Sequence, residues 1–101
     1  MALRQLEYVV AVAETLSFTR AAERCSVVQS ALSHQIARLE DELGTCLFER
    51  SSRKVRVTQS GELLADYARR ILAQAGEARA ELDAIAGLTR GGLVVGATQA
   101  P

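Results

Sequence analysis

The chain has 101 residues, of which 49% are hydrophobic, and its twelve basic residues balance twelve acidic ones. This length buries one modest core, so we expect one domain with an appendage. No run of about 18 apolar residues exists and charges come too early for a secretory signal, which predicts a cytoplasmic protein without a membrane segment. With zero net charge, any binding to nucleic acid must rest on a local basic cluster.

The cysteine pattern argues against a metal site. Cys25 and Cys46 form no Cys-x-x-Cys pair and share the chain with a single histidine. We expect two buried thiols, with a redox switch as the alternative, and no cofactor in this chain. The sequence also lacks a Gly-rich phosphate loop and a nucleophile with a base beside it, so we expect no enzyme.

Two helices are predicted at the start of the chain. Apolar residues recur at helical spacing over residues 3–13, which indicates a scaffold helix. Ser17 precedes a second helix over residues 18–24 and can cap it through its hydroxyl group. Thr19 and Arg20 lie in the first turn of this helix, whose backbone N–H groups are suited to bind a phosphate.

The segment QSALSHQIARLEDEL predicts a two-faced helix over Gln29–Leu43. The apolar face carries Val28, Leu32, Ile36, Leu39 and Leu43. The outward face carries Ser30, His34, Ala37, Arg38 and Asp41. Polar side chains at its start and a small alanine favour a helix that reads a DNA major groove. Only residues 26–28 separate it from the previous helix, which is the arrangement of a helix-turn-helix.

A basic hairpin, which we call the wing, is predicted after a left-handed stop at Gly44. Residues 47–50 and the alternating VRVT at 55–58 flank a polar turn. The segment RSSRKVR holds four cations and no acid, namely Arg50, Arg53, Lys54 and Arg56. Three helices and this hairpin predict a mainly α fold, a winged helix-turn-helix. A merely solvated surface is the alternative for the charges.

A long helix is predicted from Gln59 to about Leu88, with Thr58 as its cap. Thirty residues would span about 45 Å, which is too long to fold back onto so small a core. Its apolar residues alternate four and three apart as in a coiled coil: Leu64, Ala68, Ile71, Ala75, Ala78, Leu82 and Ile85. We therefore predict a homodimer through this seam. Packing against a domain of the same chain is the alternative.

The domain organisation follows from the breaks in this pattern. Glycines at residues 87–92 predict a hinge, and an apolar strand is expected over 93–97. We expect a DNA-binding domain over 1–58, a linker and dimerisation helix over 59–88, and over 89–101 a hinge with the first strand of a truncated effector-binding domain.

Three segments together resemble the N-terminal region of LysR-type transcriptional regulators: LRQLEYVVAVAETLSFTRAAERC, VVQSALSHQIARLEDELGTCLFER and VRVTQSGELL. The resemblance covers about residues 2–90 in the order and spacing of the family. It implies a bacterial regulator that binds double-stranded promoter DNA as a dimer through its long helix. It further implies a tetramer of the full-length protein, and a small-molecule effector bound by the missing domain.

The resemblance also assigns residues to DNA. The start of the recognition helix is matched by Gln29, Ser30, Ser33 and His34, and a later basic position by Arg38. Arg50 and Arg53 match the wing. Two residues depart from the family pattern: Val28 stands where a capping serine or threonine is frequent, and Ser30 stands where proline is frequent.

Physical roles for these residues follow from their chemistry. Gln29 suits a bidentate contact to adenine, with helix capping as the alternative. Ser33 suits a phosphate or a base edge, with a bond to its own helix as the alternative. His34 lies opposite the apolar face and is assigned to DNA, with plain solvent exposure as the alternative.

The remaining cations are assigned to the DNA backbone, where they supply salt-dependent affinity: Arg38, Arg50, Arg53 and Lys54. Gln29→Ala is expected to change the preferred sequence, whereas Arg53→Ala is expected to weaken all binding. Sequence-specific DNA binding is therefore the predicted function. The alternative is a coiled-coil interaction module without sequence-specific binding.

Overall fold

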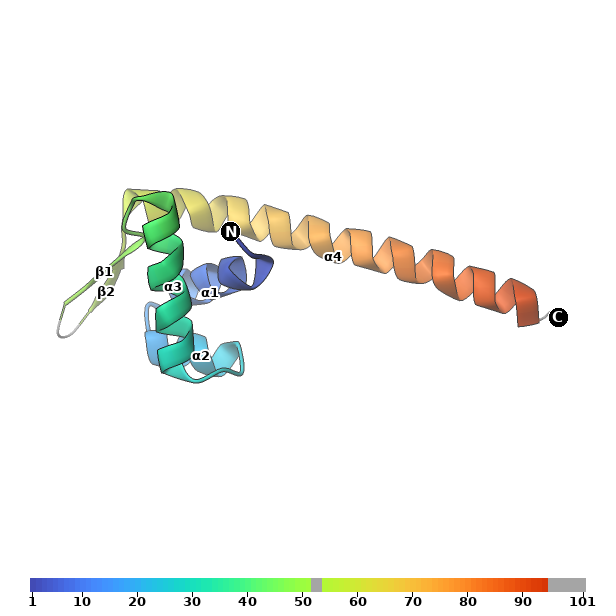
Figure 1. Cartoon of the computed structure of the whole chain (residues 1–101), viewed down its shortest axis with the longest axis horizontal. Coiled ribbons are helices and arrows are strands. Elements are labelled where there is room, and N and C mark those ends of the chain that lie inside the picture. The colour runs from blue at the N-terminus through green and yellow to red at the C-terminus, as the bar shows by residue number, and fades with distance from the viewer. Residues whose placement is uncertain (52–53, 95–101) are drawn as a thin grey trace.

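The computed structural model, which describes residues 1–51 and 54–94, has a small helical body from which one long helix projects (Figure 1). The elements in chain order are α1 Leu3–Thr15, α2 Phe18–Arg24, α3 Gln29–Leu43, β1 Phe48–Arg50, β2 Val55–Val57 and α4 Gln59–Val94. Because α4 extends far beyond the body, the longest dimension of the molecule is 63 Å. The predicted winged helix-turn-helix is confirmed.

Local capping explains where α2 and α4 begin and where α3 ends. The Ser17 hydroxyl accepts a hydrogen bond from the Arg20 N–H at 3.1 Å and starts α2. Gly44 ends α3 with a φ of +70°, a conformation that glycine adopts without strain. The Thr58 hydroxyl accepts from the Gly61 N–H at 3.0 Å and starts α4. These three predicted caps are confirmed, whereas Val28, the residue before α3, provides no side-chain cap.

One hydrophobic core joins α1, α2, α3, the base of the wing and the first turns of α4. Its largest fully buried side chains are Leu32, Ile36, Leu39, Leu47, Val9 and Val12. The apolar face predicted for α3 is thus confirmed in its middle. It is wrong at both ends, where Val28 is 68% and Leu43 40% exposed.

The wing is a short antiparallel hairpin. Phe48 pairs with Val57 and Arg50 with Val55, which turns Phe48 into the core and leaves the strand positions of Glu49 and Arg56 exposed. The Ser51 N–H donates to the Lys54 carbonyl oxygen at 2.9 Å and closes the turn.

α4 runs as one helix from Gln59 to Val94, so the hinge predicted at residues 87–92 is wrong. A glycine in a helix costs about 1 kcal/mol relative to alanine, which is too little to end a helix of this length. The predicted strand is also wrong at residues 93–94, and its remainder at 95–97 lies outside the described residues.

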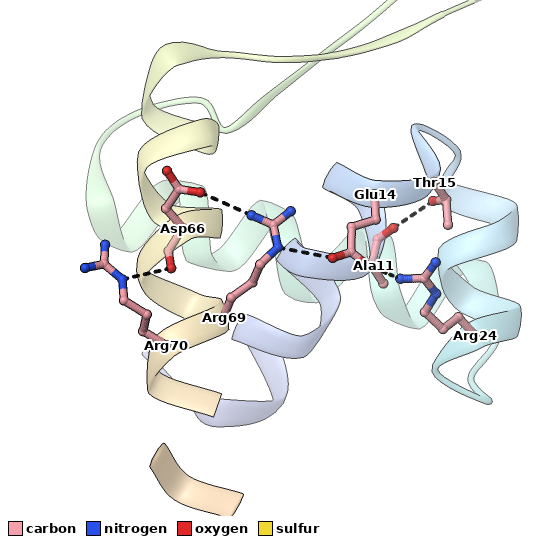
Figure 2. Close-up of polar contacts among 7 residues, drawn as sticks. All are labelled: Ala11, Glu14, Thr15, Arg24, Asp66, Arg69 and Arg70. Carbon is pink, nitrogen blue, oxygen red and sulfur yellow. Dashed lines mark hydrogen bonds and ion pairs between the residues drawn. The ribbon is translucent and has the colours of Figure 1, made fainter. Parts of the chain in front are cut away.

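Ion pairs link α4 to the helix-turn-helix (Figure 2). The Glu14 carboxylate on α1 accepts from Arg24 of α2 at 2.5 Å and from the Arg69 Nε of α4 at 3.1 Å. Arg69 also contacts Asp66, one turn earlier on its own helix, at 3.2 Å. α1 therefore connects the helix-turn-helix with the base of the long helix.

Candidate nucleic-acid interface

α3 presents a polar surface along the side that the core does not cover. Gln29, Ser30, His34 and Arg38 are exposed, as predicted, and Ser33 is half-buried at the edge of this surface. The Ser33 side chain makes no hydrogen bond to the helix backbone within the described residues. Figure 1 shows the wing projecting from the end of the body at which α3 meets α4.

Four predicted residues from three elements line one hollow of about 360 Å³, which we call the α3–wing hollow. Thr19 comes from α2, Gln29 from the start of α3, and Arg50 and Lys54 from the wing. Two cations and two hydrogen-bonding side chains thus face a common space. Such a space suits a negatively charged backbone that passes between helix and wing.

An aromatic pair holds Arg50 in place. Its guanidinium carbon lies 3.7 Å from the centroid of the Phe18 ring, which favours a cation–π interaction. The Phe18 ring meets the Phe48 ring edge-on, with centroids 6.0 Å apart. The guanidinium group of Arg50, a residue that lines the hollow, is therefore oriented by the Phe18 ring in the free chain.

Gln29 is also oriented in advance. The Thr19 hydroxyl donates to the Gln29 Oε1 atom at 3.0 Å, across the turn of the helix-turn-helix. Gln29 does not cap α3 with its side chain, so the capping alternative is not observed. The sequence contained no signal for this contact beyond the presence of two polar residues.

Two of the predicted DNA-binding residues have a different outcome: the backbone role of Arg20 requires correction, and the role of Arg53 stays a prediction. The Arg20 N–H is already bonded to Ser17, so it is not available to a phosphate. Arg53 lies outside the described residues. The Arg20 side chain is exposed on the surface of α2.

Residues that the predictions omitted also shape this region. Arg56 lines a second hollow of the wing together with Arg50 and Lys54. The alternating pattern of VRVT was the sequence signal that indicates an exposed side chain at this position. The Glu40 carboxylate accepts from the Leu47 N–H at 2.7 Å and fixes the passage from α3 to the wing.

The α4 seam divides into two parts. Ala68 is fully buried within its own chain and Leu64 packs against the core, so the prediction that Ala68 faces a partner is wrong. Ile71 and Ala75 are half-buried. Farther along, Ala78, Leu82 and Ile85 are exposed as expected. The alternative of packing within the chain therefore holds for the first turns of α4.

The exposed apolar residues of those first turns are Leu63, at 61% exposure, and Tyr67, at 51%. Together with later residues they form one face of the helix, which we call the apolar stripe: Leu63, Tyr67, Ile71, Ala78, Leu82 and Ile85. At its start the stripe is displaced by one position from the predicted seam, because α1 covers the neighbouring face.

Both cysteines are free thiols. Cys25 is half-buried, and burial raises the pKa of its thiol. Cys46 is exposed in the passage from α3 to the wing, so the expectation of two buried thiols is wrong there. Within residues 1–51 and 54–94, no three His, Cys, Asp or Glu side chains gather as metal ligands. No helix in the same part of the chain has the length and apolar character needed to cross a membrane.

Comparison with known proteins identifies a family whose sequence pattern this chain matches. Residues 3–62 match the model of the family described as bacterial regulatory helix-turn-helix protein, lysR family. The chain is 58% identical over 72 residues to the DNA-binding transcriptional dual regulator OxyR of Escherichia coli K12, a match that covers 71% of this chain and 24% of OxyR. It is 45% identical over 98 residues to the HTH-type transcriptional regulator BudR of Klebsiella aerogenes, covering 97% of this chain and 68% of BudR.

Solved structures agree with this comparison. The BenM DBD in complex with catB site 1 DNA superposes with a TM-score of 0.81 at 43% identity, covering 85% of this chain and 97% of that one. A full-length OxyR variant from Pseudomonas aeruginosa gives a TM-score of 0.80 at 45% identity, covering 83% of this chain and 28% of that one. The match to OxyR of Escherichia coli takes up about a quarter of that protein's length.

Proposed function

The chain belongs to the lysR family of bacterial regulatory helix-turn-helix proteins, and we propose that it is the sequence-specific, double-stranded DNA-binding part of a transcriptional regulator. The α3–wing hollow carries this proposal. In a chain of zero net charge, Arg50 and Lys54 lie beside the start of an exposed polar helix. The helix that would contact base edges and the cations that would contact the DNA backbone are therefore adjacent.

In this proposal α3 enters the major groove. A helix with its side chains is about 10–12 Å wide, which fits a groove of about 12 Å. Gln29, Ser30 and His34 are exposed near the start of α3 and contact base edges. Ser33 and Arg38 flank them and contact the backbone.

The wing supplies the affinity that does not depend on sequence. Arg50 and Lys54 neutralise phosphates and release the counterions bound to them. We assign Arg53 the same role from its place in the basic segment, and Arg56 joins them on the exposed face of the wing. Relatives named as DNA-binding regulators and a related domain in complex with DNA support this assignment.

The matched variants Gln29→Ala and Lys54→Ala test the proposal. Selection of bound duplexes from random DNA should show that Gln29→Ala relaxes the preference at one base pair, at a cost of about 1–3 kcal/mol for the preferred sequence. Lys54→Ala should weaken all duplexes about equally and reduce the salt slope by about 1. Binding of the unmodified chain without any sequence preference would contradict the proposal and favour an interaction module.

We further infer a homodimer through the apolar stripe of α4. The stripe continues over six turns, and four of its large side chains are more than half exposed in the single chain, namely Leu63, Tyr67, Leu82 and Ile85. A face of this size is seldom left in water on a monomer. Dimerisation would place two α3 helices on two half-sites of one operator.

Properties of the whole regulator are also proposed. We place the DNA-binding domain at residues 1–58 and the linker helix from 59 onward, followed by an effector-binding domain for a small molecule. A tetramer that bends promoter DNA fits this organisation. Because chromosomal DNA is the proposed partner, we also propose that the protein is located in the bacterial cytoplasm.

A further inference from the structure

The hydrogen bond between Thr19 and Gln29 determines which groups Gln29 can offer to DNA. The Oε1 atom of Gln29 accepts from the Thr19 hydroxyl at 3.0 Å. The two hydrogens of its Nε2 atom make no hydrogen bond within the described part of the chain. A free glutamine amide can turn its oxygen and its nitrogen toward DNA together. Here Oε1 keeps a second lone pair, but Thr19 holds this oxygen toward α2. The end of the amide without a partner is therefore Nε2, which carries two donors.

Base pairs distinguish these two arrangements. Adenine shows an acceptor, N7, beside a donor, N6, and therefore needs both ends of the amide. Guanine shows two acceptors, N7 and O6, and matches two donors. The orientation of one amide thus decides between the two purines at a single position.

We propose that Thr19 is a positioning residue for base recognition, whose hydroxyl holds the Gln29 oxygen so that the Nε2 hydrogens face the groove and select guanine over adenine. This inference rests on the proposed function, with α3 in the major groove. It replaces the adenine contact that the sequence predicted for Gln29.

The positions of Thr19 and Gln29 in the fold allow their hydrogen bond to orient the Gln29 side chain. Thr19 lies in the first turn of α2 and has a branched side chain with few rotamers, so its hydroxyl has few positions available. Gln29 is the first residue of α3, and its flexible side chain loses rotamer freedom when it is fixed. Part of that entropy is already lost in the free protein. DNA that covers the hollow would also remove the water that competes for an exposed bond.

The test compares the whole chain with Thr19→Val and Thr19→Ser. Valine keeps the shape of threonine and removes the hydroxyl, whereas serine keeps the hydroxyl and removes a methyl group. Selection with Gln29→Ala first identifies the base pair that Gln29 reads, as the position whose preference disappears. Competition binding then measures the ratio of affinities for duplexes with guanine and with adenine at that position, and thermal melting checks that each variant is folded.

The unmodified chain and Thr19→Ser should prefer guanine roughly tenfold. Thr19→Val should lose this preference or reverse it toward adenine, while preferences at other positions stay the same. The inference is overturned if the unmodified chain prefers adenine there, or if Thr19→Val keeps the original ratio. Absence of any sequence preference in the unmodified chain is a different result, because it refutes the proposed function itself.

Discussion

The Glu14 carboxylate lies between two guanidinium groups that come from different helices (Figure 2). Hydrogen bonds from Arg24, and then from Arg69, lower the pKa of this carboxyl group. The charged form is favoured in the folded chain, so these contacts stabilise the fold only while Glu14 is ionised.

Glu14→Gln is therefore expected to destabilise the fold near pH 7 and not at low pH. The lowered pKa means that the stabilisation is complete above the unfolded value of 4.5 and is lost as the pH falls through the lower folded value. The carboxylate is 40% exposed, so we expect a difference of about 1 kcal/mol or less. Urea denaturation from pH 7 down to pH 3 measures it.

Glu23→Gln provides the matched control, because Glu23 makes no ion pair among the described residues. Its free energy of unfolding should stay close to that of the unmodified chain throughout this range. A Glu14→Gln deficit that persists unchanged at pH 3 would show that charge is not the cause.

At the scale of the elements, the beginning of α4 is packed against the entry to the wing with no space to spare. A Cβ atom at Gly61 would lie 2.1 Å from the Leu47 carbonyl oxygen and 2.8 Å from the Val57 Cγ1 atom. One of these neighbours is backbone that is itself bonded to Thr58, so it has little freedom to move.

Gly61→Ala should destabilise the chain by about 1–3 kcal/mol, as overpacking does in other cores. Gly76→Ala is the matched control, because its Cβ would meet nothing within 4 Å. In the interior of an exposed helix that change should stabilise by about 0.5–1 kcal/mol. Midpoints of urea unfolding compare the two, and equal effects of the same sign would contradict this account of Gly61.

The elements themselves were largely predictable from the sequence. The bounds of α3 follow from a clear apolar period and from Gly44, and the caps at Ser17 and Thr58 follow from local chemistry. The end of α4 was not predictable in the same way, because glycines lower helix propensity only slightly. The Thr19–Gln29 and Phe18–Arg50 contacts join residues that are distant in the chain, and they depend on how α2, α3 and the wing pack together.

At the scale of the whole molecule, the body covers one face of the first turns of α4 and leaves another face exposed, and this exposed face is the one that we propose for dimerisation. Periodicity alone placed Leu64 and Ala68 in the seam, because they continue the spacing of Leu82 and Ile85. Only the position of α1 shows that the body of the same chain covers them and leaves Leu63 and Tyr67 exposed.

Leu82→Glu should weaken self-association roughly tenfold or more, because it places a charge in an apolar contact. Ala80→Glu is the control, since Ala80 is exposed on a different face of α4. Sedimentation equilibrium measures both variants, with thermal melting as the check on folding. If the unmodified chain stays monomeric at high concentration, or if both variants dissociate alike, the stripe is not the interface.

A single residue, Thr58, joins the wing to α4, so a rotation of the body turns α4 with it. Thr58 donates its hydroxyl to the Cys46 carbonyl oxygen at 2.6 Å and caps α4 at the same time, so no slack separates the two elements. The 36 residues of α4 form an arm about 54 Å long. A tilt of about 5° at its base displaces the far end by roughly 5 Å, more than the rise of about 3.4 Å between base pairs. A small rotation of the body therefore displaces the far end of α4 by more than the spacing between neighbouring base pairs.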